Sequence, residues 1–313
     1  MVPQAVASPT ERGGEPSYIV AVESTHRPHL DANTGSAVTV TIPALCFGLY
    51  KVPNDLEGEQ IVLNAIDEAG YRSLDSAPIY GNEETVGNAL AKCTSVGRSD
   101  LFIASKVWND AQRRGRSAVR ESVEKSLQDL QCNYLDICYV HWPVPEHFVE
   151  TYKELQLLQN EGKIRYLGIS NFNVEEYERL TGSDGVSIKP LIHQFEISPF
   201  MYRPERIKYF QDKGILLAAS KALHRATDLD KGVSAVGAIA DNHGISAAQV
   251  LLRWSLQKGF MPLSKTSKLD RMRQNRDIFG LNLSKSEIEI LDSLTEDSSI
   301  RSREERELES KNW

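Results

Sequence analysis

The segment from residue 101 to residue 141 decides the fold class, because two strand patterns flank a helical one. It begins with LFIASKV (101–107), continues with SAVRESVEKSLQDLQ (117–131) and ends with YLDICYVH (134–141). The two outer segments are almost continuously apolar, which is typical of strands with both faces buried. In the middle segment, apolar residues recur at helical spacing. Strands that alternate with helices of this length predict an α/β fold with a parallel sheet.

The same alternation of strand and helix continues on both sides of this segment. With LCFGLY (45–50) as the first strand, eight strand–helix units follow over about 270 residues, which suits a closed (β/α)8 TIM barrel better than an open sheet. The other strands are expected at YRSLDSA (71–77), IRYLGISN (164–171), PLIHQFE (190–196), ILLAAS (215–220) and FMPLS (260–264).

The two ends of the chain differ from the regular middle. Residues 1–36 are rich in Pro, Gly, Ser, Thr and charge, and we expect a partly flexible extension there. Within it, YIVAV (18–22) has the composition of a strand, and AVTVTIPAL (37–45) alternates, so a short N-terminal β-hairpin is predicted. The barrel domain is expected over residues 37–300. Residues 301–313 are interpreted as a C-terminal tail, whose charge run RSREEREL (301–308) is expected to be solvated.

Composition and charge limit the class of protein. The chain has 313 residues, of which 41% are hydrophobic, and a formal charge of −7 with a pI of about 5.6. An acidic chain of this kind is not expected to bind nucleic acid or membrane surfaces. No apolar run reaches the roughly 18 residues that span a membrane, and the first 17 residues lack the apolar centre of a secretory signal.

Neither disulfides nor a metal site are expected. The four cysteines are scattered without a CxxC pair, which indicates reduced thiols in a cytoplasmic protein. Two histidines in HRPH (26–29) are the one candidate metal motif. Because no further ligand lies nearby, that segment is interpreted as a solvated turn.

Titratable residues lie at the ends of three successive predicted strands. Asp75, Lys106 and His141 occupy these ends, and Tyr80 follows Asp75 by five residues. The carboxyl ends of barrel strands converge on one face, which is where barrel enzymes build their active sites. An ion pair with a packed tyrosine and histidine would explain each residue singly, but the joint recurrence favours a catalytic cluster.

The chemistry of these four residues is coherent. A tyrosine is a weak acid, with a reference pKa of about 10. An ammonium about 4 Å from its hydroxyl favours the tyrosinate by up to about 4 kcal/mol at an effective dielectric of about 20, although desolvation opposes this. Asp75 would keep Lys106 charged, His141 would orient a substrate oxygen, and Tyr80 would protonate that oxygen as negative charge develops.

Four motifs together resemble the aldo-keto reductase family. They are GYRSLDSAPIYGNEETVG (70–87), FIASKVW (102–108), YLDICYVHWP (134–143) and GKIRYLGISNF (162–172), and the similarity runs from about residue 38 to residue 295. The resemblance implies a (β/α)8 barrel that reduces an aldehyde or ketone with NADPH. It also implies that the family's catalytic Asp, Tyr, Lys and His are Asp75, Tyr80, Lys106 and His141, and that a monomer is the commonest form.

The resemblance also implies where NADPH would bind, extended across the barrel rim. Ser170, Asn171 and Gln194 would hold the nicotinamide amide, and Ser220 would contact the pyrophosphate. The basic segment KTSKLDRMRQN (265–275) would surround the 2′-phosphate, because a phosphate dianion is best bound by a guanidinium, an ammonium and a helix N-terminus. The residues expected at that end are Lys265, Thr266, Arg271 and Asn275.

Two positions depart from the family pattern. In PLSK (262–265), two residues separate the usual Pro and Lys, so a remodelled exit loop is expected after the last strand. Ala219 stands where the family commonly has an aromatic ring on the nicotinamide face. A lost stack removes about 0.5–1.5 kcal/mol beyond area burial. Either another side chain covers the nicotinamide, or affinity for the cofactor is lower.

Two features of the sequence favour functions other than reduction by this family. YFQDK (209–213) matches the YxxxK spacing of short-chain dehydrogenases, but the chain lacks their glycine-rich first turn, so we interpret it as a surface helix. A barrel that binds NADPH as a regulatory or scaffold subunit is the second alternative. The substitution at Ala219 leaves this alternative open, and the intact catalytic set argues against it.

The substrate is predicted only by class. Tyr50, Trp108 and Trp142 lie near strand ends and would suit an apolar or ring-bearing carbonyl compound. The segments after Pro143 and after residue 295 are short, which favours an open site. No obligate protein partner is evident.

Overall fold

A closed barrel of parallel strands forms the centre of the molecule in this computed structural model, which describes residues 17–22, 38–224, 234–296, 304–308 and 311. Around the barrel the strands run in the order β10, β3, β4, β5, β6, β7, β8, β9, and every neighbouring pair is parallel. Their bounds are β3 Cys46–Gly48, β4 Ser73–Asp75, β5 Phe102–Val107, β6 Leu135–Val140, β7 Ile164–Ser170, β8 Ile192–Glu196, β9 Leu216–Ser220 and β10 Phe260–Ser264. The predicted (β/α)8 barrel is confirmed.

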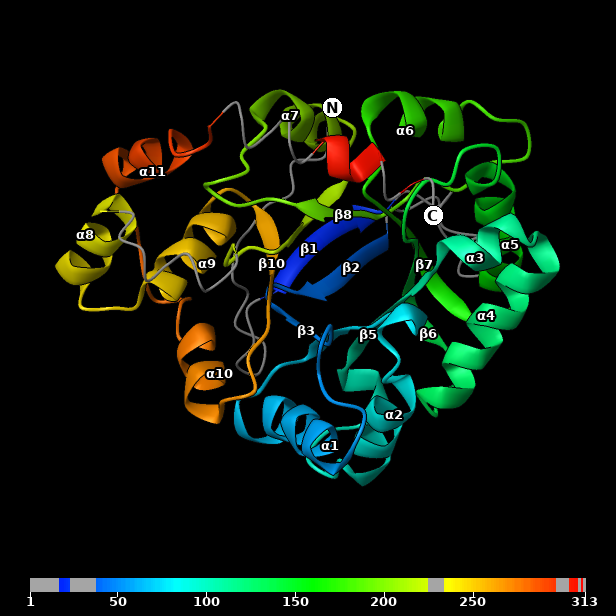
Figure 1. Ribbon diagram of the computed structural model, residues 1–313, viewed down its shortest axis with the longest axis horizontal. Helices are drawn as coiled ribbons and strands as arrows, with labels where there is room; N and C mark the ends of the chain where they lie inside the picture. Colours follow the sequence, from blue (N-terminus) through cyan, green and yellow to red (C-terminus); the bar gives the residue numbers. More distant parts are fainter. Residues whose placement is uncertain (1–16, 23–37, 225–233, 297–303, 309–310, 312–313) are drawn as a thin grey trace.

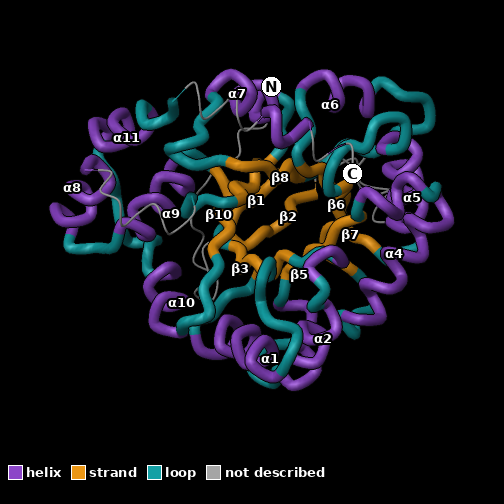
Figure 2. Tube along the Cα trace, viewed as in Figure 1, coloured by secondary structure: helices purple, strands orange, loops and turns teal. Residues whose placement is uncertain are grey.

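Helices surround the barrel as an outer ring (Figure 2). The main ones are α1 Leu56–Leu63, α2 Glu83–Lys92, α3 Asn109–Arg113, α4 Arg116–Asp129, α5 Phe148–Asn160, α6 Val174–Thr181, α7 Pro204–Asp212, α8 Ser234–His243, α9 Ala247–Gln257, α10 Leu269–Arg276 and α11 Lys285–Asp292. Short π- and 3-10-helical segments span Asn64–Glu68, Pro78–Tyr80 and Arg98–Asp100. None of the described helices is long and apolar enough to cross a membrane.

The predicted N-terminal hairpin strands pair with each other outside the barrel sheet. β1 (Ser17–Val22) runs antiparallel to β2 (Val38–Pro43), with Ser17 opposite Pro43. Figure 1 shows the pair lying across the centre of the barrel. Ser17 and Pro43 line a cavity together with Phe102, the first residue of β5. The pair therefore covers the amino ends of the strands and leaves the carboxyl ends for the site.

Every residue of β5 and β6 is buried, which explains their continuous apolar sequence. Inside the barrel, Gly168 leaves room for a ring: a Cβ added there would lie 2.4 Å from Cδ1 of Tyr139. Tyr139 is 1% exposed, and its ring lies 6.0 Å from the ammonium of Lys106. The barrel interior beneath the carboxyl ends of the strands is thus filled by closely packed side chains.

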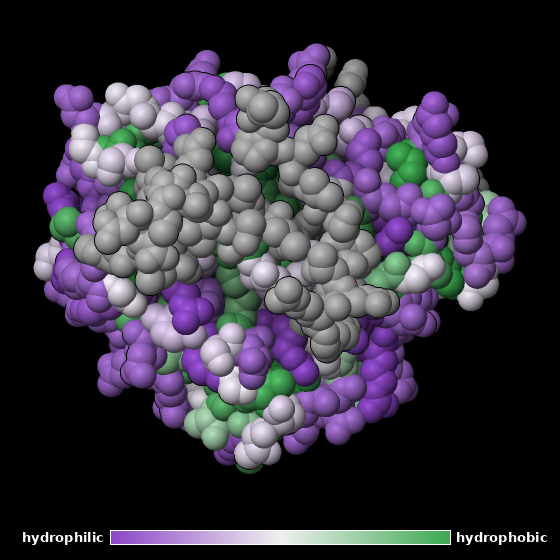
Figure 3. All heavy atoms as spheres, turned by 180° about the vertical axis from the view of Figure 1, so that it is seen from behind, coloured by the Kyte–Doolittle hydropathy of each residue, from purple (hydrophilic) through white to green (hydrophobic). Residues whose placement is uncertain are grey.

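On the face opposite to that of Figure 1, most of the visible described side chains are polar (Figure 3). The YFQDK segment lies mainly on α7, outside the barrel, and the Tyr209 hydroxyl hydrogen-bonds to Glu178. The interpretation of that segment as a surface helix is confirmed. The charge run near the C-terminus is not solvated throughout, because Glu307 is 8% exposed and pairs with Arg203 and Arg206.

Candidate active site

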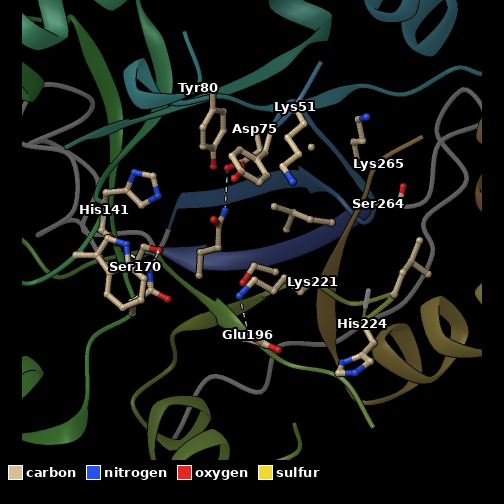
Figure 4. A pocket seen from close by; sticks show the side chains of 18 of the residues that line it. Lys51, Asp75, Tyr80, His141, Ser170, Glu196, Lys221, His224, Ser264 and Lys265 are labelled. Atoms are coloured by element: carbon tan, nitrogen blue, oxygen red, sulfur yellow. Dashed lines mark hydrogen bonds and ion pairs between the residues drawn. The ribbon is translucent and has the colours of Figure 1, made fainter. Parts of the chain in front are cut away.

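The four candidate catalytic residues meet at the carboxyl end of the barrel. Asp75 ends β4, Lys106 lies one residue before the end of β5, and His141 directly follows β6. Tyr80 ends the 3-10 turn Pro78–Tyr80. Figure 4 shows Asp75, Tyr80 and His141 around the same cavity. Convergence of the strand ends therefore brings the predicted cluster together.

The two residues that follow Tyr80 hold its loop in place. Gly81 follows with φ 68°, a left-handed conformation that glycine adopts without steric cost. The next side chain, Asn82, is fully buried and donates to the carbonyl oxygens of Leu49 at 2.9 Å and Val52 at 2.8 Å. These bonds hold the loop after β4 against the loop after β3, so the phenol is held above Asp75.

Lys106 is the centre of the cluster. Its Nζ donates to Asp75 Oδ2 at 2.7 Å, to the Ser76 carbonyl oxygen at 2.7 Å and to Tyr80 Oη at 3.2 Å. These acceptors use all three donor positions of an ammonium. Burial is the largest single effect and lowers the pKa of Lys106, but the charges of Asp75 and Tyr80 and their hydrogen bonds together outweigh it and raise this pKa above its ordinary value. Lys106 is therefore charged at neutral pH.

Two opposing effects act on the pKa of Tyr80. Burial raises the pKa of Tyr80 above its ordinary value, and the opposing effect of Lys106 does not cancel this rise. Of the two opposing effects expected from the sequence, desolvation is therefore the larger, and it disfavours tyrosinate more than Lys106 favours it. A neutral phenol beside a fixed ammonium is still the form that a proton donor needs.

His141 is 8% exposed and packed between two aromatic rings. Its ring lies edge-on to Trp108, with 4.8 Å between centroids, and edge-on to Tyr80 at 6.1 Å. Burial, with a smaller effect of Lys106, holds the pKa of His141 well below its ordinary value. The neutral ring has one N–H to donate, and its Nδ1 has no hydrogen-bond partner among the described residues.

Three of the predicted cofactor residues join this cluster directly. Asn171 Nδ2 donates to the His141 carbonyl oxygen at 3.0 Å and to Ser170 Oγ at 3.1 Å. Gln194 Nε2 donates to Asp75 Oδ1 at 2.8 Å. Ser170, Asn171 and Gln194 all line the cavity, so the ends of β7 and β8 present polar side chains next to Asp75 and His141.

The residues predicted to bind the phosphate groups of the cofactor lie at the ends of β9 and β10 and on α10. Ser220 and Lys265 line the cavity. Thr266 Oγ1 accepts from the backbone N–H of Lys268, just before α10 begins. Arg271 is exposed on α10, whereas Asn275 is 3% exposed. The structure thus brings two of these residues to the cavity wall and leaves Thr266, Arg271 and Asn275 on the adjoining helix and its approach.

The aromatic candidates for the substrate pocket separate into two groups. Tyr50 is 58% exposed, and its ring centroid lies 5.2 Å from that of Tyr80. Tyr50 and Trp142 both line the cavity. Trp108 is not among the cavity-lining residues and packs against His141 instead. Trp108 therefore supports a candidate catalytic residue rather than forming the open wall.

Sequence reasoning missed several charged residues of the cavity. Glu196 ends β8 and accepts from Lys221 Nζ at 2.9 Å. The strand-end argument that selected Asp75 would also have selected Glu196. No sequence signal indicated that Arg306 and Glu307 would reach the cavity. The missed charged and titratable residues in the lining are Lys51, Glu196, Lys221, His224, Arg306 and Glu307.

The two departures from the family pattern also have structural outcomes. Leu263 and Ser264 lie in β10 and pair with Cys46 and Phe47 of β3, so they extend the strand instead of remodelling a loop. Ala219 is 0% exposed and is not among the residues that line the cavity.

Comparison with known proteins agrees with this architecture. Residues 44–296 match the model of the Aldo/keto reductase family. The chain is 40% identical over 261 residues to a glyoxal reductase of Bacillus subtilis, covering 83% of this chain and 92% of the relative. It is 35% identical over 255 residues to the methylglyoxal reductase DkgA of Escherichia coli, covering 79% and 87%.

Solved structures show the same fold. An aldo/keto reductase from Brucella melitensis has a TM-score of 0.77 and 31% sequence identity, covering 90% of this chain and all of that one. The family match spans the whole barrel. The matches to the two reductases cover about nine-tenths of the length of each relative. The chain therefore belongs to the aldo-keto reductase family and is an oxidoreductase that reduces an aldehyde or ketone.

Proposed function

We propose that the protein is an NADPH-dependent carbonyl reductase in which Tyr80 is the general acid. The observation that carries the proposal is the position of Lys106. Its ammonium contacts both Asp75 at 2.7 Å and the Tyr80 hydroxyl at 3.2 Å, beside a cavity of about 850 Å³. The size lies within the range of cofactor and ligand sites, roughly 300–1,000 Å³.

The residues around the cavity fit a nicotinamide dinucleotide. Ser170, Asn171 and Gln194 offer both donors and acceptors, which a carboxamide requires. Ser220 and Lys265 also line the cavity, at the ends of the next two strands, β9 and β10, and would face the phosphate groups. Exposed Arg271 and the start of α10 would bind the 2′-phosphate, with Thr266 and Asn275 beside them, and this set supports NADPH over NADH.

The reaction follows from the properties of the four residues. When bound, the reduced nicotinamide would supply the hydride. His141, neutral in its buried site, would donate a hydrogen bond to the carbonyl oxygen and orient it. Tyr80 would transfer its hydroxyl proton to that oxygen as negative charge develops. Lys106 would stabilise the phenolate left on Tyr80, and Asp75 would keep Lys106 charged.

The nature of the substrate is proposed from the cavity and the relatives. Two relatives are named for glyoxal and methylglyoxal, so short 2-oxoaldehydes are the first compounds to test. The rings of Tyr50 and Trp142 also line the cavity and would accept a larger apolar carbonyl compound.

The test is the replacement Tyr80→Phe in the full chain. We expect loss of carbonyl reduction by about 10²-fold or more, measured as NADPH oxidation with a panel of aldehydes and ketones, while NADPH affinity measured by calorimetry stays unchanged. An unaltered rate would contradict the assignment of Tyr80. Cofactor binding by the natural chain without turnover of any carbonyl would favour the regulatory alternative.

Three further predictions from the sequence accompany this function: a monomer, a cytoplasmic location, and a barrel domain over residues 37–300. The oligomeric state is checked by sedimentation, the location by cell fractionation, and the domain limits by limited proteolysis.

A further inference from the structure

A lysine contributes to the cavity wall at the end of β9. Ala219 is completely buried, whereas Lys221 lines the cavity and its side chain is 48% exposed. Lys221 has φ 51°, in the left-handed region that non-glycine residues seldom adopt. The chain turns directly after β9, and the Lys221 side chain lies at the cavity, two residues beyond the buried Ala219.

A buried carboxylate holds this ammonium in place. Lys221 Nζ donates to Glu196 Oε2 at 2.9 Å, and the Glu196 side chain is only 4% exposed. Figure 4 shows Lys221 beside the cavity with this contact drawn. An ammonium has three donor positions, and the contact with Glu196 uses one. The ammonium is thus preorganised for an anion, which reduces the entropic cost of binding.

The position along the cavity identifies the anion. Ser170 and Gln194 lie on β7 and β8, where the proposed nicotinamide amide would bind, and Lys265 follows β10, two strands beyond β8 around the barrel and towards the proposed 2′-phosphate site. Glu196 and Lys221 line the wall between them. In an extended dinucleotide, the segment between these two ends is the diphosphate, which carries two negative charges.

We propose that Lys221 binds the diphosphate group of the dinucleotide and shields it from the negative charge of Glu196. This proposal rests on the proposed function, because it assumes that a dinucleotide occupies the cavity. The diphosphate is common to NADPH and NADH, so Lys221 contributes equally to the binding of both. Arg271, in contrast, distinguishes the two cofactors.

The experiment measures dissociation constants by calorimetry for the full-length natural chain and for Lys221→Met. The probes are NADPH, NADH and 2′-phospho-ADP-ribose, which lacks the nicotinamide. We expect Lys221→Met to raise all three constants by a similar factor of about 10 to 100, as for loss of one charged hydrogen bond. Lys208→Met is the matched control, because it removes an exposed ammonium that pairs with Asp212 on α7, and it should change none of them.

The outcomes separate this proposal from the proposed function. Absence of NADPH binding by the natural chain would overturn both. Binding by the natural chain with an unchanged constant in Lys221→Met would overturn the role of Lys221 alone. A loss seen with NADPH and NADH but not with 2′-phospho-ADP-ribose would also overturn it, because Lys221 would then act on the nicotinamide.

A second variant tests the shielding of Glu196. Lys221→Met removes the ammonium that lies beside the Glu196 carboxylate, so Glu196→Gln added to that variant should recover about tenfold of the lost affinity. The double variant binding as weakly as Lys221→Met would overturn the shielding. Lys221→Arg should retain affinity within about threefold, since it keeps the charge. Thermal unfolding of each variant without ligand verifies that the fold is intact.

Discussion

Replacing Asp75 by asparagine should destabilise the protein more than any conservative change at the surface. Lys106 is 1% exposed and Asp75 is 3% exposed, with 2.7 Å between Nζ and Oδ2. The replacement keeps the shape of the side chain and removes its charge, which leaves an ammonium buried without a counterion. Loss of one partner of a buried ion pair costs about 3–5 kcal/mol, so the free energy of unfolding at pH 7 should fall by that amount.

The pH dependence of this loss has a definite sign. In the natural chain the pKa of Lys106 is raised above its ordinary value of 10.5, so the stabilisation is complete below that value and is lost as the pH rises through the folded-state pKa. Without Asp75, burial should lower the pKa of Lys106 below its unfolded value. The deficit of Asp75→Asn should therefore shrink as the pH rises towards about 10.

Urea unfolding at several pH values measures both effects. Asp212→Asn is the matched control, because Asp212 pairs with Lys208 on the surface and its loss should cost less than about 1 kcal/mol. A deficit of Asp75→Asn within 1 kcal/mol of that control at pH 7, or one that grows towards pH 10, would refute the argued role of Asp75.

Three other predictions follow from the site and the barrel. The rate of reduction should show no inflection between about pH 6 and 9, because the pKa of His141 lies well below its ordinary value and the pKa of Tyr80 lies above its own. A step in the kcat/KM profile near the ordinary histidine pKa of 6.5 would contradict this. Arg271→Ala should raise the KM for NADPH about tenfold or more, because it removes one charged hydrogen bond, and it should leave the KM for NADH unchanged. An equal rise of both KM values in steady-state assays would exclude a role at the 2′-phosphate. Gly168→Ala should lower the free energy of unfolding by about 1–3 kcal/mol, because the added Cβ would lie 2.4 Å from the Tyr139 ring; an unchanged urea midpoint would show that the ring moves freely.

The architecture and most of the candidate catalytic cluster could be predicted from the order of residues along the chain. Strand and helix patterns arise from local burial, and their alternation allows few topologies. Once the barrel is inferred, the carboxyl ends of its strands must converge, so Asp75, Lys106 and His141 could be placed together without coordinates. Gln194 followed from the family resemblance, and the structure joins it to Asp75.

The electrostatics of the site and the rest of the cavity wall became known only from the folded chain. The pKa of Tyr80 depends on how deeply its hydroxyl is buried relative to Lys106, and sequence does not give that depth. The ion pair of Lys221 with Glu196 and the burial of Glu307 against Arg203 depend on side chains from distant segments. Such contacts leave no periodic or local pattern in the chain, since they arise from packing after the barrel has closed, and for that reason only the folded molecule reveals them.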